Sequence, residues 1–266
     1  MLNVAVALKH LGAPCEAVTV LGGESGAAIE RELGEMELRS SVIPSAAATR
    51  ICTTILSAGE TTELVENAPA IGHSDVEQFR RRFLERVAEA QVVVVTGSIP
   101  PGVEPSIWRQ LISDCADRTI LDVRGPELLE VLAYRPLLIK PNRHELELTL
   151  GRNLDTESSI RTAMQELRER GAQWVVVTDG SSAIWIAGPE DQWRAQPLRV
   201  PTINPIGCGD CLAAGSAARL LAGDDMLECI RYGVAAAADN AAQLLPSRLN
   251  PGRVTQMAQR VLIERL

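Results

Sequence analysis

Short apolar runs alternate with amphipathic helical periods along most of this chain, and that alternation limits the possible folds more than any other feature. Four runs rich in β-branched residues end in turn residues: 91–97, 118–123, 136–140 and 173–180. Helical periods occupy 75–90, 104–115 and 156–170. Near-continuous apolar strands separated by helices are typical of a parallel sheet that is covered on both faces. The sequence therefore predicts an α/β fold with a doubly wound, mostly parallel sheet sandwiched by helices.

One segment, 50–66, departs from this rhythm. It is rich in threonine, its residues alternate in polarity, and Ala-Gly stands at 58–59, a pattern that predicts a β-hairpin. We expect a single domain over 1–266 with a small β lid, at approximately 41–67, inserted in it. The last quarter is Ala-rich, so we expect helices throughout 209–266.

Charge and composition favour a small-molecule partner. The 266 residues carry a net charge of -8, whereas surfaces that bind nucleic acid or anionic membranes are normally basic. The only lysines, Lys9 and Lys140, do not form the loop of P-loop nucleotidases. The N-terminus lacks the basic start of a signal peptide, no apolar run reaches the roughly 18 residues of a membrane span, and the six cysteines are scattered. We expect a cytoplasmic protein that binds neither nucleic acid nor membranes.

The stretch NPIGCGD, 204–210, combines two glycines and a carboxylate before an Ala-rich helical run. In open α/β sheets ligands lie beyond the carboxyl ends of the strands, so turns near that edge are the places to search. Gly207 and Gly209 let backbone amides approach an anion, and a helix N-terminus binds phosphate readily. Asp210 is then either a functional carboxylate or only the N-cap of the helix.

The same stretch contains a C-x-x-C pair, Cys208 and Cys211, which by itself suggests a redox dithiol or half of a zinc site. A zinc site is disfavoured because there is no second C-x-x-C, and His10, His73 and His144 lack ligand spacing. A helix N-terminus lowers a thiol pKa, which leaves a regulatory disulfide as one hypothesis. The favoured alternative is that both cysteines are small residues packed beneath the helix.

Three further motifs fit a purely structural role as well as a functional one. KPNRHELE places Asn142 and Glu145 three residues apart after a strand, which is also the spacing of a capping box. The turn 178–180 needs a glycine whatever the function, and the loop around Ser98 is stiffened by prolines. A lone lid arginine, Arg50, is more often solvated than bound to a ligand. The order of these motifs along the chain adds weight to their functional interpretation.

In chain order, the segments LNVAVALKHLG with VLGGESG, TGSIPPGV, KPNRHELE, VVVTDG and NPIGCGD resemble the ribokinase-like sugar kinases over essentially the whole chain. The resemblance is strongest to their phosphofructokinase-B branch, which includes 1-phosphofructokinase and tagatose-6-phosphate kinase. It implies a ribokinase-like fold, ATP and Mg²⁺ as cofactors, and transfer of the γ-phosphoryl group to a sugar hydroxyl. Such a transfer needs positioning and distributed positive potential more than covalent chemistry.

The resemblance also implies a catalytic role for the NPIGCGD stretch. Asp210 corresponds to the base that takes the proton from the attacking hydroxyl. The amides of Gly207, Cys208 and Gly209 correspond to an anion hole for the transferring phosphoryl group.

For the cofactors, Asn142 and Glu145 are similar to the family's N-x-x-E pair, which organises magnesium and phosphate through water. The implied contacts to ATP fall on Lys140, Thr178, Asp179, Gly180 and Asn240.

On the acceptor side, the resemblance matches Asn3 to the Asn of a G-x-N-V-A turn, Arg50 to a lid arginine that meets the sugar phosphate, and Ser98 to another contact near it. A guanidinium fork suits a phosphate, so we expect a sugar phosphate as acceptor, of the fructose 1-phosphate, fructose 6-phosphate or tagatose 6-phosphate class. A homodimer through the lid is a further expectation.

Met1 stands where the family has the last glycine of G-G-K-G, so the resemblance implies a kinase domain that is incomplete at its N-terminus. The segment upstream normally supplies the first strand, part of the lid and an Asp that grips sugar hydroxyls. Two alternatives therefore stay open. One is an inactive nucleotide- or sugar-binding remnant, and the other is a kinase for a non-phosphorylated sugar such as ribose.

Overall fold

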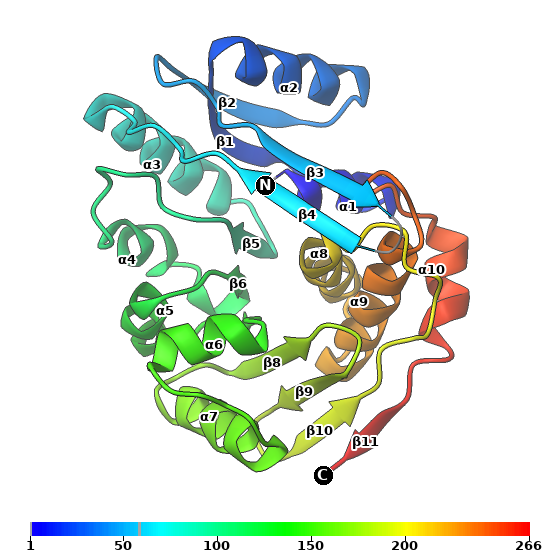
Figure 1. Cartoon of the computed structure of the whole chain (residues 1–266). Helices are drawn as coiled ribbons and strands as arrows, with labels where there is room; N and C mark the ends of the chain where they lie inside the picture. The colour runs from blue at the N-terminus through cyan, green and yellow to red at the C-terminus, as the bar shows by residue number, and fades with distance from the viewer. Residues whose placement is uncertain (1, 58–59) are drawn as a thin grey trace.

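A mixed sheet of seven strands lies at the centre of the computed structural model, which describes residues 2–57 and 60–266 (Figure 1). In chain order its strands are β5 (Val93–Thr96), β6 (Thr119–Asp122), β7 (Leu138–Ile139), β8 (Trp174–Asp179), β9 (Ala183–Ala187), β10 (Gln192–Ala195) and β11 (Ile263–Arg265). Strands β5 to β8 pair in parallel, and β8 to β11 pair antiparallel. The predicted α/β fold class is confirmed, and the four β-branched runs form the parallel half of the sheet.

Helices cover both faces of this sheet because successive strand residues point to opposite sides. Leu121 and Ile139 pack into one apolar cluster, whereas their neighbours Ile120 and Leu138 pack into the other. The first cluster is completed by α3 (His73–Val87), α4 (Ile107–Ile112), α5 (Pro126–Val131), α6 (Arg143–Leu150) and α7 (Glu157–Glu169). The second is completed by α1 (Asn3–His10), α8 (Cys208–Leu221), α9 (Met226–Ala241) and α10 (Pro251–Ala258).

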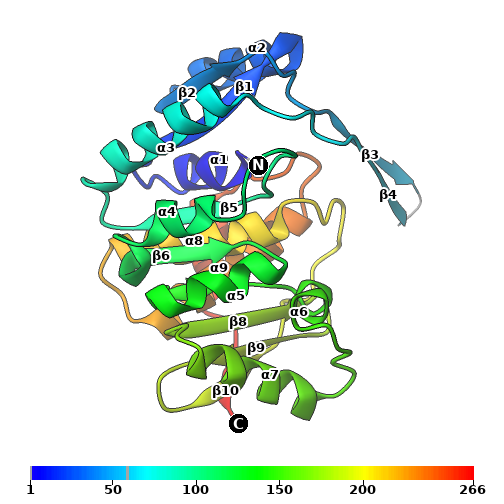
Figure 2. The same cartoon turned by 90° about the vertical axis from the view of Figure 1, so that its left-hand side faces the viewer.

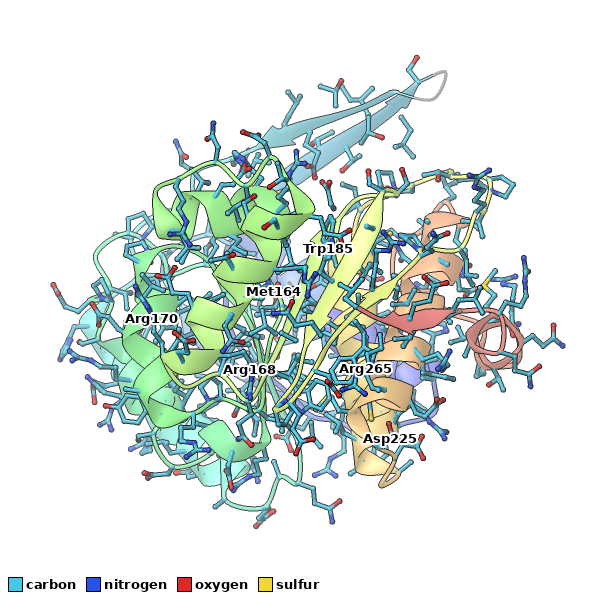
Figure 3. The ribbon with its side chains drawn as sticks, turned by 90° about the horizontal axis from the view of Figure 1, so that it is seen from below. Met164, Arg168, Arg170, Trp185, Asp225 and Arg265 are labelled. Carbon is cyan, nitrogen blue, oxygen red and sulfur yellow. The ribbon has the colours of Figure 1, made fainter. Side chains whose placement is uncertain are left out.

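The view from below shows the first of these layers, in which Met164 of α7 lies near the strand that carries Trp185 (Figure 3). Short 3₁₀ turns at Ala116–Arg118 and Leu132–Tyr134 lead from α4 to β6 and from α5 to β7. Across residues 2–57 and 60–266, none of the helices combines the length and the apolar character needed to cross a bilayer.

The end of the chain corrects one prediction. We expected helix up to the last residues, but α10 ends at Ala258 and residues 263–265 form the edge strand β11. This strand pairs antiparallel with β10, and the amide of Leu266 donates to the carbonyl of Gln192 at 2.9 Å. Backbone pairing with an open sheet edge therefore outweighs the weak helical preference of the segment.

A second layer lies above the main sheet (Figure 2). In it β1 (Ala17–Gly22) and β2 (Ser40–Ser45) pair in parallel across α2 (Gly23–Glu35). The next two strands, β3 (Cys52–Ser57) and β4 (Glu60–Val65), form the predicted hairpin, which projects away from the body. Its predicted turn at 58–59 lies outside the described residues.

Candidate active site

Three polar side chains from the ends of parallel strands converge on the first turn of α8. Thr96 ends β5, Asp122 ends β6, and Lys140 directly follows β7. Parallel strands present their carboxyl ends at one edge of a sheet, which is where ligands bind in such folds. Helix α8 packs against both β5 and β6, so its N-terminus lies at that edge (Figure 1).

Asp210 is held by two donors from distant parts of the chain. Asn3 Nδ2 donates to Asp210 Oδ2 at 2.9 Å, and Thr96 Oγ1 donates to Oδ1 at 3.3 Å. The N-cap of α8 is Gly207, and no side chain caps this helix end. The interpretation of Asp210 as a mere N-cap is therefore wrong, and its carboxylate is fixed in direction by α1 and β5.

The glycines at this helix start allow a close approach of neighbouring groups. Gly207 has φ 79°, in the left-handed region that favours glycine. A Cβ on Gly207 would lie 3.3 Å from Asn3 Nδ2, and one on Gly209 would lie 3.1 Å from Lys140 Nζ. A side chain at either position would push on the groups that surround Asp210.

The backbone amides here are only partly used by the fold. Cys208 N donates to the carbonyl of Pro205 at 3.3 Å. For Gly207 and Gly209, no amide partner exists within the portion of the chain that the structure describes. These two amides and the positive end of the α8 dipole are available to an anion.

Lys140 and Asp122 form a buried ion pair, with Nζ 2.9 Å from Oδ1 and side-chain exposures of 4% and 16%. Burial lowers the pKa of the Lys140 ammonium, but the carboxylates of Asp122, Glu145 and Asp210 outweigh burial and raise this pKa above its ordinary value. The lysine therefore stays charged beside the start of α8. Glu145 and Asp210 are close enough to act on it, which places all three carboxylates in one site.

Asn142 and Glu145 form the capping box at the start of α6. Glu145 N donates to Asn142 Oδ1 at 2.8 Å, and Asn142 N donates to Glu145 Oε2 at 2.9 Å. The structural interpretation of this motif is confirmed. It is compatible with a second use, because the Glu145 carboxylate also faces Lys140.

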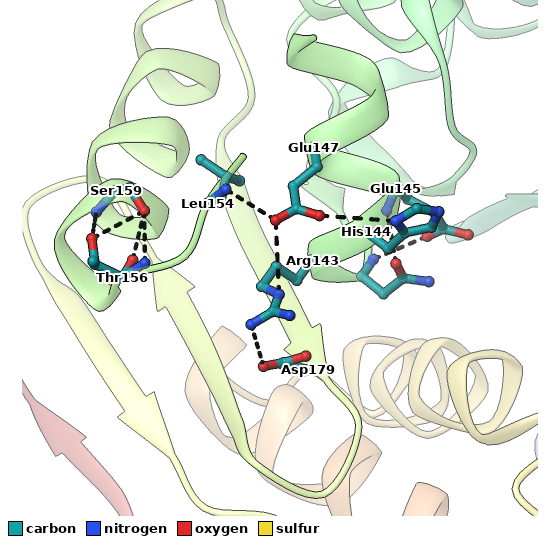
Figure 4. A network of polar contacts seen from close by, with 9 residues as sticks. Arg143, His144, Glu145, Glu147, Leu154, Thr156, Ser159 and Asp179 are labelled. Atoms are coloured by element: carbon teal, nitrogen blue, oxygen red, sulfur yellow. Dashed lines mark hydrogen bonds and ion pairs between the residues drawn. The ribbon is translucent and has the colours of Figure 1, made fainter. Parts of the chain in front are cut away.

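An ion pair joins the start of α6 to the end of β8. Arg143 Nη1 lies 3.2 Å from Asp179 Oδ2 (Figure 4), and the amide of Thr178 donates to the carbonyl of Pro141 at 3.3 Å. Gly180 follows directly in the turn to β9. The two segments predicted to hold ATP are therefore adjacent in the fold.

Comparison with known proteins identifies this arrangement. Residues 1–246 match the family model described as pfkB family carbohydrate kinase. The chain belongs to this family. It is thus a carbohydrate kinase, a phosphotransferase with an alcohol group as acceptor, and membership implies the use of ATP.

Solved structures of similar kinases cover nearly the whole chain. Phosphofructokinase-2 from Escherichia coli, in complex with substrates and products, is 27% identical, with a TM-score of 0.85 over 97% of this chain and 86% of that one. A Staphylococcus aureus protein assigned as a phosphofructokinase is 25% identical, with a TM-score of 0.83 over 100% and 86%. A Thermotoga maritima protein assigned as a 1-phosphofructokinase shares the fold, with a TM-score of 0.90, at 23% identity over 100% and 86%.

Asn240 belongs to a buried network behind the segment 204–207, which precedes α8. Its Nδ2 donates to the carbonyl of Ile206 at 2.8 Å, and its Oδ1 accepts from Ser247 N at 2.6 Å. Asn204 adds a second bridge, since Nδ2 donates to the Leu244 carbonyl at 2.9 Å and Oδ1 accepts from Ile206 N at 3.0 Å. Asn240 thus supports the loop, and its contact with the nucleotide stays a prediction.

Cys208 and Cys211 lie in the first turn of α8, and one property predicted for them is wrong. Burial raises the pKa of the Cys208 thiol, and it raises that of Cys211 to about 12. Cys208 Sγ contacts the carbonyl of Ala237 at 3.4 Å, and Cys211 Sγ contacts Ser247 Oγ at 3.7 Å. The expected lowering of the thiol pKa by the helix N-terminus is wrong, because desolvation outweighs the helix dipole here. Packing beneath the helix is the better interpretation.

The structure does not join the predicted acceptor-phosphate residues to this site by any contact. Ser98 is exposed in the loop after β5, and Arg50 is half-buried just before β3. Within the described residues, Arg50 has neither a hydrogen bond nor an ion pair. Asn3 alone among the predicted acceptor residues contacts Asp210.

Sequence reasoning missed Thr96, Asp122 and Arg143 as members of this site. Each of the first two is the polar residue that closes an apolar strand, and Arg143 is the first residue of α6. Thr96 and Asp122 could have been found from the sequence, because each ends an apolar run and such ends meet at the carboxyl edge of a parallel sheet.

Proposed function

We propose that this kinase transfers the γ-phosphoryl group of ATP to a hydroxyl of a sugar phosphate of the fructose 1-phosphate, fructose 6-phosphate or tagatose 6-phosphate class. The observation that carries the proposal is the Asp210 carboxylate, which Asn3 and Thr96 orient beside the free amides at the start of α8. Escherichia coli phosphofructokinase-2, solved with fructose-6-phosphate, supports the acceptor class at 26% identity.

In this mechanism Asp210 is the general base. Each of its oxygens has one fixed donor, which leaves lone pairs for the acceptor hydroxyl. The hydroxyl proton passes to the carboxylate while the hydroxyl oxygen attacks the γ-phosphorus and ADP leaves. The amides of Gly207 and Gly209, together with the α8 dipole, stabilise the charge on the transferring group. Lys140, held charged by its carboxylate neighbours, adds positive potential at the same place.

Magnesium fits the site through water rather than by direct coordination. In residues 2–57 and 60–266, no group of three His, Cys, Asp or Glu side chains could hold a metal ion, and one oxygen of Glu145 is used by the capping box. The remaining donors are oxygens, which Mg²⁺ prefers while it keeps several waters. Asp122, Asp210 and Glu145 face a single ammonium, so polyphosphate binding calls for an added cation. Asn142 and Glu145 would hold hydrated Mg²⁺, which neutralises phosphate charge.

ATP binds along the adjoining ends of β7 and β8 in this proposal. The residues proposed to bind it are Lys140, Thr178, Asp179, Gly180 and Asn240. The adjacency of these segments across the Arg143–Asp179 ion pair supports one continuous binding region.

Arg50 provides the preference for a phosphorylated acceptor. Its guanidinium is unpaired within the described residues and matches a phosphate bidentately. Ser98, exposed after β5, is proposed as a second phosphate contact, and Asn3 lies on the acceptor side of the base.

Steady-state ADP formation with matched phosphorylated and neutral sugars, with and without Mg²⁺, tests the proposal. Fructose 6-phosphate or one of its two alternatives should be turned over only with Mg²⁺. Arg50→Ala should raise KM for the sugar phosphate about tenfold with little change in kcat, because a ground-state contact is lost. Arg81→Ala, an exposed arginine on α3, is the matched control. Equal effects of Arg50→Ala on phosphorylated and neutral sugars would contradict the acceptor class.

The proposal includes a homodimer formed through the hairpin β3–β4. Ile51, Ile55 and Leu64 of this segment are between 49% and 57% exposed. Ile55 and Leu64 lie on the same face of the hairpin, and an exposed apolar patch commonly marks an interface. Ile55→Glu should convert the dimer to a monomer in sedimentation velocity, whereas Leu148→Glu, an exposed leucine on α6, should not. A wild-type monomer would contradict this part.

The six free cysteines support a reducing, cytoplasmic location.

A further inference from the structure

Thr49, the residue immediately before Arg50, is held by three hydrogen bonds to the start of α2. Its amide donates to the carbonyl of Gly22 at 2.8 Å, and its Oγ1 accepts from Gly22 N at 3.0 Å. The hydroxyl of Ser25 donates to the carbonyl of Thr49 at 2.5 Å. We call Gly22, Ser25 and Thr49 the Thr49 clamp. It uses both backbone groups and the side chain of one half-buried residue.

The glycine of this clamp allows the chain leaving β2 to cross directly over the end of β1. A Cβ at Gly22 would lie 2.2 Å from the carbonyl oxygen of Ala47 and 2.3 Å from that of Ser45. Ser45 Oγ also donates to Asp75 Oδ2 of α3 at 2.7 Å. The segment 45–49 is thus tied to both α2 and α3 before it enters the hairpin (Figure 2). The VLGGESG stretch of the sequence serves this crossing.

We propose that Thr49 is a positioning residue for the acceptor phosphate, acting through Arg50. This inference rests on the phosphate-binding role of Arg50 in the proposed function. Consecutive Cα atoms are about 3.8 Å apart, so the clamp fixes the backbone from which the Arg50 side chain starts. Within the described residues no hydrogen bond or ion pair restrains that guanidinium.

The physical basis is the ordering of Arg50 before the acceptor arrives. A phosphate contact from an arginine on an unfixed backbone must offset the loss of backbone and side-chain entropy on binding. With the backbone held by the clamp, the backbone part of that cost is already met by folding, and only the side-chain part remains. Release of one clamp bond should therefore weaken acceptor binding and leave phosphoryl transfer itself unchanged.

The test is Thr49→Val, which keeps the shape of the side chain and removes the acceptor used by Gly22 N. KM for the sugar phosphate should rise about fivefold to tenfold, the value of one hydrogen bond. Both kcat and kcat/KM for the neutral sugar should stay within about twofold. Thr49→Ser, which retains the hydroxyl, should restore the wild-type KM. Thr162→Val is the matched control, since Thr162 is exposed on α7.

A double variant shows whether Thr49 acts through Arg50. In an Arg50→Ala background, Thr49→Val should cause no further rise in KM, because two residues on one route are not additive. A rise that multiplies with that of Arg50→Ala overturns the inference, as does an unchanged KM in the single variant.

If Thr49→Val does not fold, as judged by thermal melting, Ser25→Ala removes a different clamp bond and must meet the same criteria. A wild-type enzyme without preference for phosphorylated sugars refutes the proposed function and the inference together. A KM effect of Arg50→Ala without one from the clamp variants refutes the inference alone.

Discussion

The start of α8 and the hairpin β3–β4 differ in how firmly the fold holds their functional groups. Around α8, Lys140 is 3% and Asn240 1% exposed, Lys140 is paired with Asp122, and the side-chain nitrogen and oxygen of Asn240 both have protein partners. On the hairpin, apolar side chains such as Ile55 and Leu64 are about half exposed, and Arg50 at its base has no partner within the described residues. Groups that stabilise a transition state gain from being fixed in advance, whereas an acceptor contact needs access to solvent.

This contrast predicts that substitutions around the start of α8, called here the α8 corner, affect kcat and stability, while substitutions at the base of the hairpin β3–β4 affect KM for the acceptor. The Thr49 clamp ties the base of the hairpin to the β1–α2 layer, and Ser45 ties the same segment to α3.

The largest effect is expected for Asp210→Asn. Loss of the general base should lower kcat about 10²- to 10⁴-fold, while KM for ATP stays within about twofold. Asp155→Asn, an exposed position between α6 and α7, is the control. Initial rates at saturating ATP and sugar phosphate measure the effect. A turnover within threefold of the wild type would remove Asp210 from the mechanism.

A large effect on stability is expected for Lys140→Met. The substitution leaves the Asp122 carboxylate, 16% exposed, without its partner, and breaking a buried pair typically costs about 3–5 kcal/mol of unfolding free energy. Chemical denaturation should show this loss, and the double variant Lys140→Met with Asp122→Leu should recover most of it. Activity should stay low in both variants, because the positive charge beside α8 is gone. Recovery of kcat in the double variant would show that Lys140 serves the fold alone.

The pH dependence of the same pair follows from the raised pKa of Lys140. A group with a raised folded pKa contributes stability that is fully present below its unfolded pKa, here 10.5, and is lost as pH rises through the folded value. The unfolding free energy of the wild type minus that of the double variant should therefore stay constant from about pH 7 to about pH 10. It should shrink above 10.5. A decline that begins near neutral pH would contradict the sign of the shift.

How much of this site the sequence could predict depends on the range of the contacts. Local patterns sufficed for the β-branched runs that became β5 to β8 and for the capping box of Asn142 and Glu145. They could not show that Asn3 donates to Asp210 across 207 positions, because such a contact depends on the packing of α1 against α8. The strands β10 and β11 were missed for the same reason. Edge strand β11 is short and its pairing with β10 is decided by tertiary context.

Burial was the other quantity that local patterns could not supply. A cysteine at a helix N-terminus suggests a lowered thiol pKa, but that holds only where water or an anion site reaches the sulfur. Cys211 is fully buried between α8 and its neighbours. The sequence shows that Cys211 lies near a helix N-terminus. It does not show that burial of the thiol opposes the effect of the helix dipole on its pKa.

The smallest effect is therefore expected for the cysteines of the α8 corner. With the pKa of Cys211 raised to about 12 and that of Cys208 raised as well, the thiolate fraction of Cys211 at pH 7 is about one part in 10⁵. Iodoacetamide should label the exposed Cys52 first, and Cys208→Ser should keep kcat within about twofold, since serine fills similar space. Peptide mapping after mild oxidation should show no disulfide between 208 and 211 while the enzyme remains folded. A disulfide there, with activity lost and then restored by a reductant, would mean that the corner opens far enough for both sulfurs to react. The start of α8 would then be less firmly held than the burial of its side chains indicates.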